Sequence, residues 1–309
     1  MKTIFLLGVD DPEMRAIERL LAHAGVLGGG DAYRIAYAVA DGRRVHPGNA
    51  YRADPVDGLV SADTLVRVEC EPREIAADVK VVVVDHHRDG DPGYGLPPAK
   101  YWEASSIGQM YNLLSEEIVP WPHGDPEAAS RAFGPVRVGL EAEFGGSEGI
   151  RALAAMDHCF PAAVRGECQT TVTYGPTPAE VLAVKYREIA AGTKSDEAAV
   201  RDRVEFFKRE LDTADDEVVG TQAVKDLRHH DLGAGYSLDL LATQVAVTTG
   251  GHAALLRHRD RDGQPEKWTL SGNATTETVL AFKEVWAPAH GLVRVYGVPE
   301  RGYAGGYTA

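Results

Sequence analysis

The stretch 79–87, Val-Lys-Val-Val-Val-Val-Asp-His-His, joins an apolar run to an acid and two imidazoles. Four consecutive valines after an alternating start are typical of a strand buried on both faces, as in a parallel sheet covered by helices. Ligands of open α/β sheets bind beyond the carboxyl ends of such strands. Asp85, His86 and His87 therefore form a candidate catalytic and metal-binding group at the end of a strand.

Strands and helices alternate through the first half of the chain, which is typical of a parallel sheet with helical crossovers. Asp11-Pro12-Glu13 is expected to open a helix, because proline is favoured in the first helical turn. Further elements are expected as strands at Ile4–Val9, Tyr33–Val39 and Thr64–Cys70, and as a helix over Ala104–Ile118.

The second half contains a run of helices and then a new α/β pattern. Helices are expected up to Asp157 and over Pro178–Ala191 and Ser195–Leu211, and a strand is expected over Val218–Leu227. A helix, a hairpin with an Asp-Gly turn, another helix, a strand and a glycine-rich tail should follow. We predict an α/β protein with an N-terminal parallel-sheet domain (1–190), a helical linker (191–216) and a smaller C-terminal domain (217–309).

Composition restricts the partners of this 309-residue chain. A hydrophobic content of 44% and a charged content of 25% are those of a soluble globular protein, and no stretch has the length of a membrane span. A net charge of -14 argues against long duplex nucleic acid, which is usually held by a basic face. Three cysteines form no disulfide framework and fit a cytoplasmic protein. A small anionic partner, bound with a cation, is easier to accommodate.

Further acids near strand or helix ends are candidate metal ligands beside Asp85 and His86, because a metal-dependent hydrolase needs several carboxylates. Asp10 and Asp11 follow the first strand, and Asp157 ends a helix. Glu69, near the end of the 64–70 strand, is the weaker candidate, because a glutamate in such a position is more often a solvated strand residue. Asp11 is as well placed to cap the first helix, and Asp157 is as well placed to be an ordinary helix-terminal acid.

Two segments of the chain together resemble the DHH phosphoesterase superfamily. They are Val82-Val83-Val84-Asp85-His86-His87 and, after a loop rich in glycine and proline, Glu103-Ala104-Ser105-Ser106-Ile107-Gly108. This superfamily includes RecJ-type exonucleases, nanoRNA phosphatases, cyclic-dinucleotide phosphodiesterases, exopolyphosphatases and manganese pyrophosphatases. The resemblance implies a DHH-type domain, a helical connector and a C-terminal domain that closes over the substrate.

The resemblance also implies roles for individual residues. Asp85 and His86 match ligands of a di-manganese site, His87 lies beside it, and Asp157 matches a further family aspartate. Ser105 and Ser106 open the next helix, where backbone amides favour an anion. Together with the acids after the first strand, the expected metal ligands are Asp10, Asp11, Asp85, His86 and Asp157.

The family's C-terminal domain ends in a glycine-rich turn that finishes in a histidine and contacts substrate. Two segments here are similar to it, and the earlier one, Thr249-Gly250-Gly251-His252, lies between a helix and the hairpin. The later segment has the position of the motif in the family. Its expected substrate-binding residues are Arg301, Gly305, Gly306 and Tyr307, with the tyrosine in place of the histidine.

The chain departs from the family in its first two motifs. The first normally carries a histidine followed by an Asp-x-Asp pair, whereas this chain has Gly8-Val9-Asp10-Asp11-Pro12-Glu13. The second normally supplies an aspartate at a strand end, where Glu69 is the best match. The family's hairpin arginine is also missing from the stretch 267–272. The sequence therefore leaves open whether one ion, two ions or none bind.

Two hypotheses of function follow from these residues. The first is a metal-dependent phosphoesterase, using Mn²⁺ or another divalent cation, that hydrolyses a small nucleotide, a short oligonucleotide or a phosphoanhydride in an interdomain cleft. The alternative is a DHH-like nucleotide-binding protein that has lost catalysis. Metal-dependent chemistry on another substrate class is a third reading, because fold does not fix function. A homodimer, formed through the exposed edge of a sheet, is a further expectation.

Overall fold

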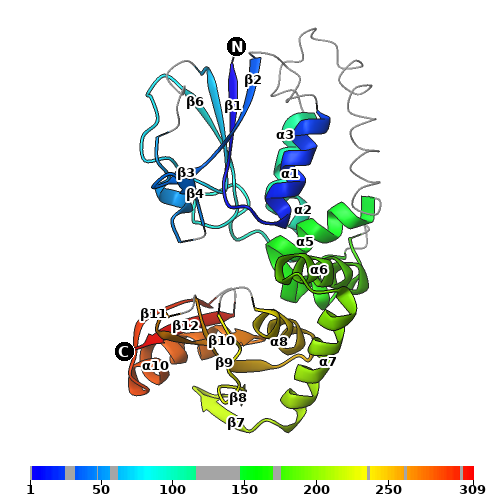
Figure 1. Ribbon diagram of the computed structural model, residues 1–309, viewed down its shortest axis with the longest axis vertical. Helices are drawn as coiled ribbons and strands as arrows, with labels where there is room; N and C mark the ends of the chain where they lie inside the picture. Colours follow the sequence, from blue (N-terminus) through cyan, green and yellow to red (C-terminus); the bar gives the residue numbers. More distant parts are fainter. Residues whose placement is uncertain are drawn as a thin grey trace. The chain divides into compact units, whose positions relative to one another are not determined.

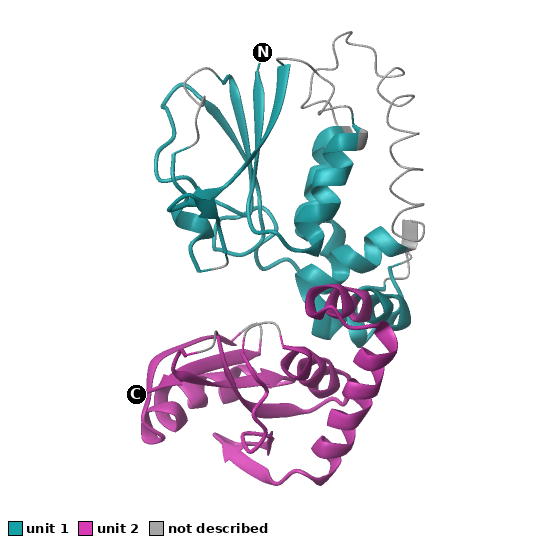
Figure 2. Cartoon of the chain, in the orientation of Figure 1, with its two compact units in different colours: residues 1–184 teal, residues 185–309 magenta. Residues whose placement is uncertain are grey.

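The computed structural model describes residues 2–24, 32–46, 48–55, 62–115, 147–169, 175–234, 237–260, 263–299 and 302–309 (Figure 1). The chain divides into two compact units, Met1–Val184 and Lys185–Ala309 (Figure 2). The three-part division expected from the sequence stays a prediction. The predicted α/β class is confirmed, because unit 1 has a parallel sheet with helices and unit 2 is a second α/β unit.

Unit 1 is organised around a four-stranded sheet in the order β2-β1-β5-β6. Its strands are β1 (Thr3–Leu7), β2 (Tyr33–Tyr37), β5 (Thr64–Val68) and β6 (Lys80–Val84), and every pairing is parallel. The register places Leu7 beside Val68 and Val68 beside Val84. The segments that follow these three residues therefore leave the sheet at one edge, where Asp85-His86-His87 begins.

The valine strand is less buried than expected. Among the strands of the described residues, β6 lies at the end of the strand order and has β5 as its neighbour on one side. Val81 is 39% exposed, and of the four valines only Val84 is buried. The prediction of a strand buried on both faces is therefore wrong for β6. The buried strand is β1, in which all five residues are buried.

Helices cover one face of this sheet, and a smaller cluster covers the other. Alternate residues of β1 point to opposite faces, so Phe5 joins the core with helices α1 (Pro12–His23), α3 (Ser106–Ser115) and α5 (Ser147–Val164). Ile4 joins the cluster beneath the loops on the other face. This second cluster includes residues near the short strands β3 (Val39–Ala40) and β4 (Arg43–Arg44) and the turn η3 (Ala50–Arg52).

The helix expected over Ala104–Ile118 is two helices. A short 3-10 turn, η5 (Pro98–Lys100), leads into α2 (Tyr101–Ala104), and Ser105 then takes an extended conformation before α3 begins. The end of the predicted helix lies outside the described residues. Helix α5 continues past Asp157, where the sequence predicted its end, although its dihedral angles are irregular at Cys159.

Unit 2 is built on a six-stranded sheet in the order β11-β12-β10-β9-β8-β7. Only the β8–β9 pairing is parallel. The strands are β7 (Asp216–Val219), β8 (Gln222–Asp226), β9 (Ala253–Arg259), β10 (Glu266–Gly272), β11 (Leu292–Val298) and β12 (Tyr303–Thr308). The helical elements are α6 (Pro178–Thr193), which begins in unit 1, α7 (Glu197–Thr213), α8 (Leu238–Thr249), α9 (Thr276–Ala281), the π-helical turn η6 (Phe282–Trp286) and α10 (Ala287–Ala289).

Two expectations for unit 2 are corrected. The single strand expected over Val218–Leu227 is the hairpin β7–β8, because Gly220 adopts a φ of 64° and turns the chain back. The glycine-rich tail is strand β12, which lies between β11 and β10. The expected hairpin at Asp260–Gly263 is present, since β9 and β10 pair antiparallel.

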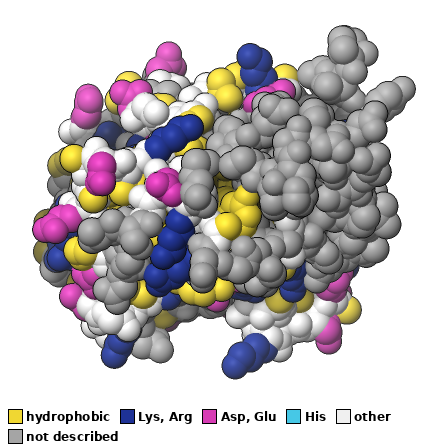
Figure 3. All heavy atoms as spheres, turned by 90° about the horizontal axis from the view of Figure 1, so that it is seen from above, with side chains coloured by type: hydrophobic (Ala, Val, Ile, Leu, Met, Phe, Trp, Pro, Cys, Tyr) yellow, Lys and Arg dark blue, Asp and Glu magenta, His cyan; other side chains and the backbone are white. Residues whose placement is uncertain are grey.

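On the face drawn in Figure 3, acidic, basic and apolar side chains are interspersed, and no histidine is seen among the described atoms. Within the described residues, no helix has both the length and the apolar character that a membrane crossing requires.

Candidate metal centre

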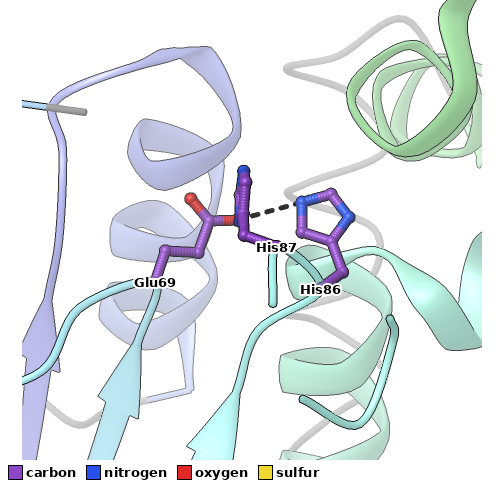
Figure 4. Close-up of side chains that lie close together, drawn as sticks. All are labelled: Glu69, His86 and His87. Atoms are coloured by element: carbon purple, nitrogen blue, oxygen red, sulfur yellow. Dashed lines mark ion pairs between the residues drawn. The ribbon is translucent and has the colours of Figure 1, made fainter. Parts of the chain in front are cut away.

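Four buried or half-buried side chains converge at the carboxyl edge of the parallel sheet. They are Glu13, Glu69, His86 and Asp157, and one ligand atom from each lies within 4.8 Å of the others. Nε2 of His86 lies 3.0 Å from Oδ2 of Asp157 and 3.5 Å from Oε1 of Glu69. Figure 4 shows Glu69 and His86 facing each other across this edge, with His87 beside them. The group combines three carboxylates with an imidazole, which is a metal-ligand set.

Glu69 is held in place by an unusual backbone conformation. It follows β5 with a φ of 49°, in the left-handed region that non-glycine residues seldom adopt. The neighbouring segment after β1 passes very close, since a side chain at Gly8 would lie 2.5 Å from the carbonyl oxygen of Glu69. Gly8 also donates a hydrogen bond to the carbonyl of Val68. Such backbone conformations persist where the surrounding structure holds them in place, and they are often found at functional sites.

Glu13 comes from the first turn of α1 and is 1% exposed. Its Oε1 accepts a hydrogen bond of 2.9 Å from the backbone N–H of Ile107, in the first turn of α3. The N-terminus of that helix attracts negative charge through its free N–H groups and its dipole. The internal carboxylate of Glu13 therefore binds an amide at the N-terminus of the helix where the sequence predicts an anion.

Asp157 and His158 enter the site from α5. The Nδ1 atoms of His158 and His86 lie 3.2 Å apart, and the other ring nitrogen of His158 lies 3.0 Å from the carbonyl oxygen of Leu96. The loop that carries Leu96 approaches closely as well, because a side chain on Gly93 would lie 2.7 Å from Cβ of His86. His158 thus links His86 to the loop after the Asp-His-His stretch and holds the ring of His86 in position.

Electrostatic repulsion acts among the three acids of this group. Burial raises the pKa of Glu13 well above its usual range, and the nearby Asp157 and Glu69 raise it further. Burial and the charge of Asp157 likewise raise the pKa of Glu69. Burial opposes ionisation of Asp157 too, but the hydrogen bond and positive charge of His86 hold its pKa below the usual range. Asp157 is therefore ionised beside His86, whereas burial and mutual repulsion destabilise the ionised forms of Glu13 and Glu69.

Asp85 does not contribute an oxygen to the group of four. Its carboxylate accepts hydrogen bonds from the Tyr51 hydroxyl at 3.0 Å, from the His86 backbone N–H at 2.7 Å and from the His87 backbone N–H at 3.1 Å. It also contacts Nδ1 of the His87 ring at 3.0 Å. Asp85 therefore shapes the turn after β6 and orients the two histidines, as carboxylates behind metal-binding histidines commonly do.

His87 is the accessible member of the site, with 41% of its side chain exposed. Its ring packs edge-on against that of His86, with centroids 4.3 Å apart. Burial lowers the pKa of His87, but the Asp85 hydrogen bond and the charges of Glu69 and Asp157 outweigh it and raise the pKa to about 9. His87 also offers a ligand atom close to those of Glu69 and His86.

The other sequence-predicted residues of unit 1 are outside the group of four, although Ser106 lies beside Glu69. Asp10 pairs with Arg15 at 2.8 Å on the surface, with 59% of its side chain exposed. Asp11 caps α1 by accepting a hydrogen bond from the Met14 N–H. Ser105 and Ser106 are fully buried, and Ser105 caps α3 through Gly108. Metal ligation by the two aspartates and substrate binding by the two serines stay predictions.

Three of the expected substrate-binding residues of unit 2, Gly305, Gly306 and Tyr307, lie in a strand and not in the predicted turn. Gly305 and Gly306 are buried within strand β12, where a side chain at Gly305 would lie 2.3 Å from the Tyr296 hydroxyl. Tyr307 donates a hydrogen bond of 2.6 Å to Asp260. Arg301 lies outside the described residues. Substrate binding by these four residues stays a prediction.

Sequence reasoning missed Glu13, which was treated as part of a helix opening. One signal was present: Asp11-Pro12-Glu13 retains the acid-x-acid spacing of the family's first motif, shifted by one residue from the adjacent pair Asp10-Asp11. Glu69, the weaker candidate, is in the group, and its burial to 5% exposure contradicts the reading of a solvated strand residue.

A divalent cation fits this arrangement. Oε2 of Glu13 and Oε1 of Glu69 are shielded from solvent and make no regular hydrogen bond within the described part of the chain. Buried carboxylate oxygens are costly unless a partner compensates them. Ligands at about 2.0–2.2 Å from a shared ion lie roughly 3–3.5 Å apart, and the two contacts of His86 Nε2 fall in this range.

No protein-family model matches the sequence, and no curated protein matches it. Among solved structures, the chain is similar to a pGpG-specific phosphodiesterase, PggH from Vibrio cholerae, with 10% sequence identity and a TM-score of 0.34. The match covers 100% of this chain and 92% of that one.

Proposed function

We propose that this protein is a divalent-metal-dependent phosphoesterase that acts on a small phosphorylated substrate such as a nucleotide, a short oligonucleotide or a phosphoanhydride. The observation that carries the proposal is the convergence of Glu13, Glu69, His86 and Asp157 at the carboxyl edge of a parallel sheet. Mixed carboxylate and imidazole ligands favour manganese, iron, cobalt or zinc over magnesium. The resemblance of the Asp85-His86-His87 stretch to DHH phosphoesterases favours manganese and phosphate chemistry.

Each residue has a distinct part in the proposed site. Glu13, Glu69, His86 and Asp157 would hold the cation, which supplies charge neutralisation for phosphate oxygens and lowers the pKa of a water molecule. Asp85 positions His87 through Nδ1 and fixes the turn that carries both histidines. His87 is exposed to solvent, so its ring can orient the attacking water or stabilise charge on the phosphate. In hydrolysis the oxygen of the attacking water forms a bond to phosphorus, the bond from phosphorus to the leaving oxygen breaks, and the proton lost by the water balances the proton taken up by the leaving oxygen.

The experiment that tests this proposal is phosphate release from a panel of phosphate esters and anhydrides in the presence of Mn²⁺, Mg²⁺ or Co²⁺. We expect hydrolysis that needs the metal and that is lost in Asp157→Asn. The matched control is Asp10→Asn, which removes a carboxylate on the surface and should retain activity. Absence of hydrolysis with every metal would overturn the proposal.

The same protein preparations separate the enzyme from the nucleotide-binding alternative. Binding of nucleotides is measured by equilibrium dialysis with and without metal. Tight nucleotide binding without metal uptake and without hydrolysis would establish the alternative. Metal uptake that depends on Glu13 and Asp157 would support the proposed enzyme, because a binding protein without metal places no demand on those buried acids.

A further inference from the structure

A second group of metal-type side chains lies in unit 2, remote in sequence from the centre described above. Glu210 is in the last turn of α7, and His229 and His230 follow strand β8 in a turn. One ligand atom from each residue lies within 4.8 Å of the others. The proposed phosphoesterase function makes no use of these three residues, so the inference stands independently of it.

The geometry of the pair Glu210–His230 suits a shared ion. Nε2 of His230 lies 3.1 Å from Oε2 of Glu210. Metal–ligand bonds of about 2.0–2.1 Å at tetrahedral angles put neighbouring ligand atoms roughly 3.3–3.4 Å apart, close to this separation. The same Nε2 atom is shielded from solvent, and the Glu210 carboxylate beside it is the partner that compensates its burial.

His229 offers a third ligand atom, which a simple ion pair between Glu210 and His230 does not require. Its ring lies beside that of His230, with centroids 4.0 Å apart and planes inclined by 43°. Glu210 and His230 would make an ion pair without any contribution from His229. The approach of a second imidazole to the same carboxylate instead completes a set of two histidines and one glutamate, which is a recognised zinc-ligand set.

Neighbouring side chains hold this group in place, and the positive charge nearby that would repel a bound cation is itself paired. The ring of His230 packs edge-on against Phe207 at 5.7 Å between centroids, and Phe207 is fully buried. The nearby cation is Arg203, which makes two hydrogen bonds to the carboxylate of Asp239. Its charge is thus offset locally, and repulsion of a bound cation is reduced.

We propose that Glu210, His229 and His230 bind a divalent transition metal of the zinc class. Three protein ligands leave a fourth position for water, since Glu210 and His230 are one third and one fifth exposed. The bound ion would join the last turn of α7 to the turn after β8. Ligand binding to the folded state alone stabilises the fold, so this ion should stabilise unit 2.

The test uses the full chain without a tag, stripped of metal, and begins from a His86→Ala background that disables the centre of unit 1. Zinc alone is titrated, and bound metal per chain is measured by elemental analysis. We expect one equivalent in the His86→Ala protein and none when His229→Ala is added. His252→Ala, which removes another histidine from unit 2, is the matched control and should keep the equivalent.

A second variant and a second readout protect the test against misfolding. Glu210→Gln preserves size and should lower zinc binding without changing the circular dichroism spectrum. Cobalt supplies the spectroscopic readout, because its ligand-field absorption is lost with its histidine ligands. No zinc in the His86→Ala protein, or one equivalent retained in both His229→Ala and Glu210→Gln, would overturn the proposal. Failure of the unit 1 centre would appear differently, as one equivalent in both wild type and His86→Ala.

Discussion

The two units place their buried or half-buried acids in opposite surroundings. In unit 1, Glu13, Glu69 and Asp157 lie together and face His86. In unit 2, Glu217 and Asp226 flank Arg228, whose guanidinium donates to Asp226 at 2.7 and 2.9 Å and also bonds to Glu217. A guanidinium keeps its charge at every relevant pH and saturates both carboxylates. An imidazole compensates only part of the charge of three acids.

This difference distinguishes a site whose acids still lack partners from a site whose acids already have their hydrogen-bond partners. The second oxygen of Glu217 accepts a hydrogen bond of 3.0 Å from the Trp286 indole, and Arg228 lies over the Trp268 and Trp286 rings. Glu13 and Glu69 of unit 1 instead retain shielded oxygens without regular hydrogen bonds within the described residues. Unsatisfied buried groups in a folded protein indicate function, because they would otherwise only cost stability.

The largest effect is expected from His86→Ala. This change removes the imidazole that contacts both Asp157 and Glu69, so the cation loses a ligand and the acids lose their compensating charge. We expect loss of manganese binding, measured by elemental analysis, and loss of metal-dependent hydrolysis. Wild-type metal content and activity in a folded variant would show that the acids of unit 1 are not a metal centre.

Asp85→Asn should have a smaller effect on the same readouts. The carboxylate orients His87 and the turn after β6 without joining the group of four. Loss of a partner behind a metal ligand typically costs about 10–100-fold in metal affinity or activity. Metal titration and hydrolysis rates measure both quantities. A complete loss of metal binding would instead make Asp85 a direct ligand, as the sequence predicted.

Removal of one acid should change stability in opposite directions in the two units. Glu69→Gln relieves burial of a charge beside Asp157 and should stabilise the metal-free protein by about 0.5–2 kcal/mol. Glu217→Gln removes a partner of Arg228 and should destabilise unit 2 by about 1 kcal/mol after partial solvent screening. Unfolding in urea measures both. The contrast between the units fails if the two signs agree.

The pH dependence of unit 2 should follow from Asp226. Burial opposes its ionisation, but hydrogen bonds and charge from Arg228 lower its pKa below the usual value. A carboxyl with a lowered pKa in the folded state contributes stability above its unfolded pKa of about 3.9, and this contribution is lost as the pH falls through the folded value. Asp226→Asn should therefore be less stable than wild type at pH 6, with a difference that shrinks toward pH 3. A constant difference across that range, measured by thermal unfolding, would contradict this assignment.

The smallest effect is expected from Asp10→Asn. Its ion pair with Arg15 is solvent-exposed, and such pairs contribute about 0.2–1 kcal/mol at most. We expect metal content equal to that of wild type and a change in unfolding free energy below about 0.5 kcal/mol. Reduced manganese content would return Asp10 to the ligand set that was predicted from the sequence.

Local patterns predicted many of the strands and helices, and part of the site. The short apolar strand β1, the proline-opened helix α1 and the position of the Asp-His-His stretch after β6 were all predicted from neighbouring residues. The predictions were wrong where the structure of a segment depends on the strands that pair with it. Strand β12 is rich in glycine and resembles a flexible tail, yet it is a strand because β10 and β11 bond to both of its edges.

Residue type and position in the chain were enough to place chemistry at the carboxyl edge of a parallel sheet, because strand period and strand ends are local properties. Tertiary structure alone decided which acids meet there. Glu13 and Asp157 come from two helices, and they reach Glu69 and His86 only once strand register and helix packing are set. The same reason explains why Asp10 and Asp11 lie outside the group although they are close to Glu13 in sequence. Helix α1 directs Glu13 into the interior, whereas Asp11 caps the N-terminus of this helix and Asp10 is exposed to solvent.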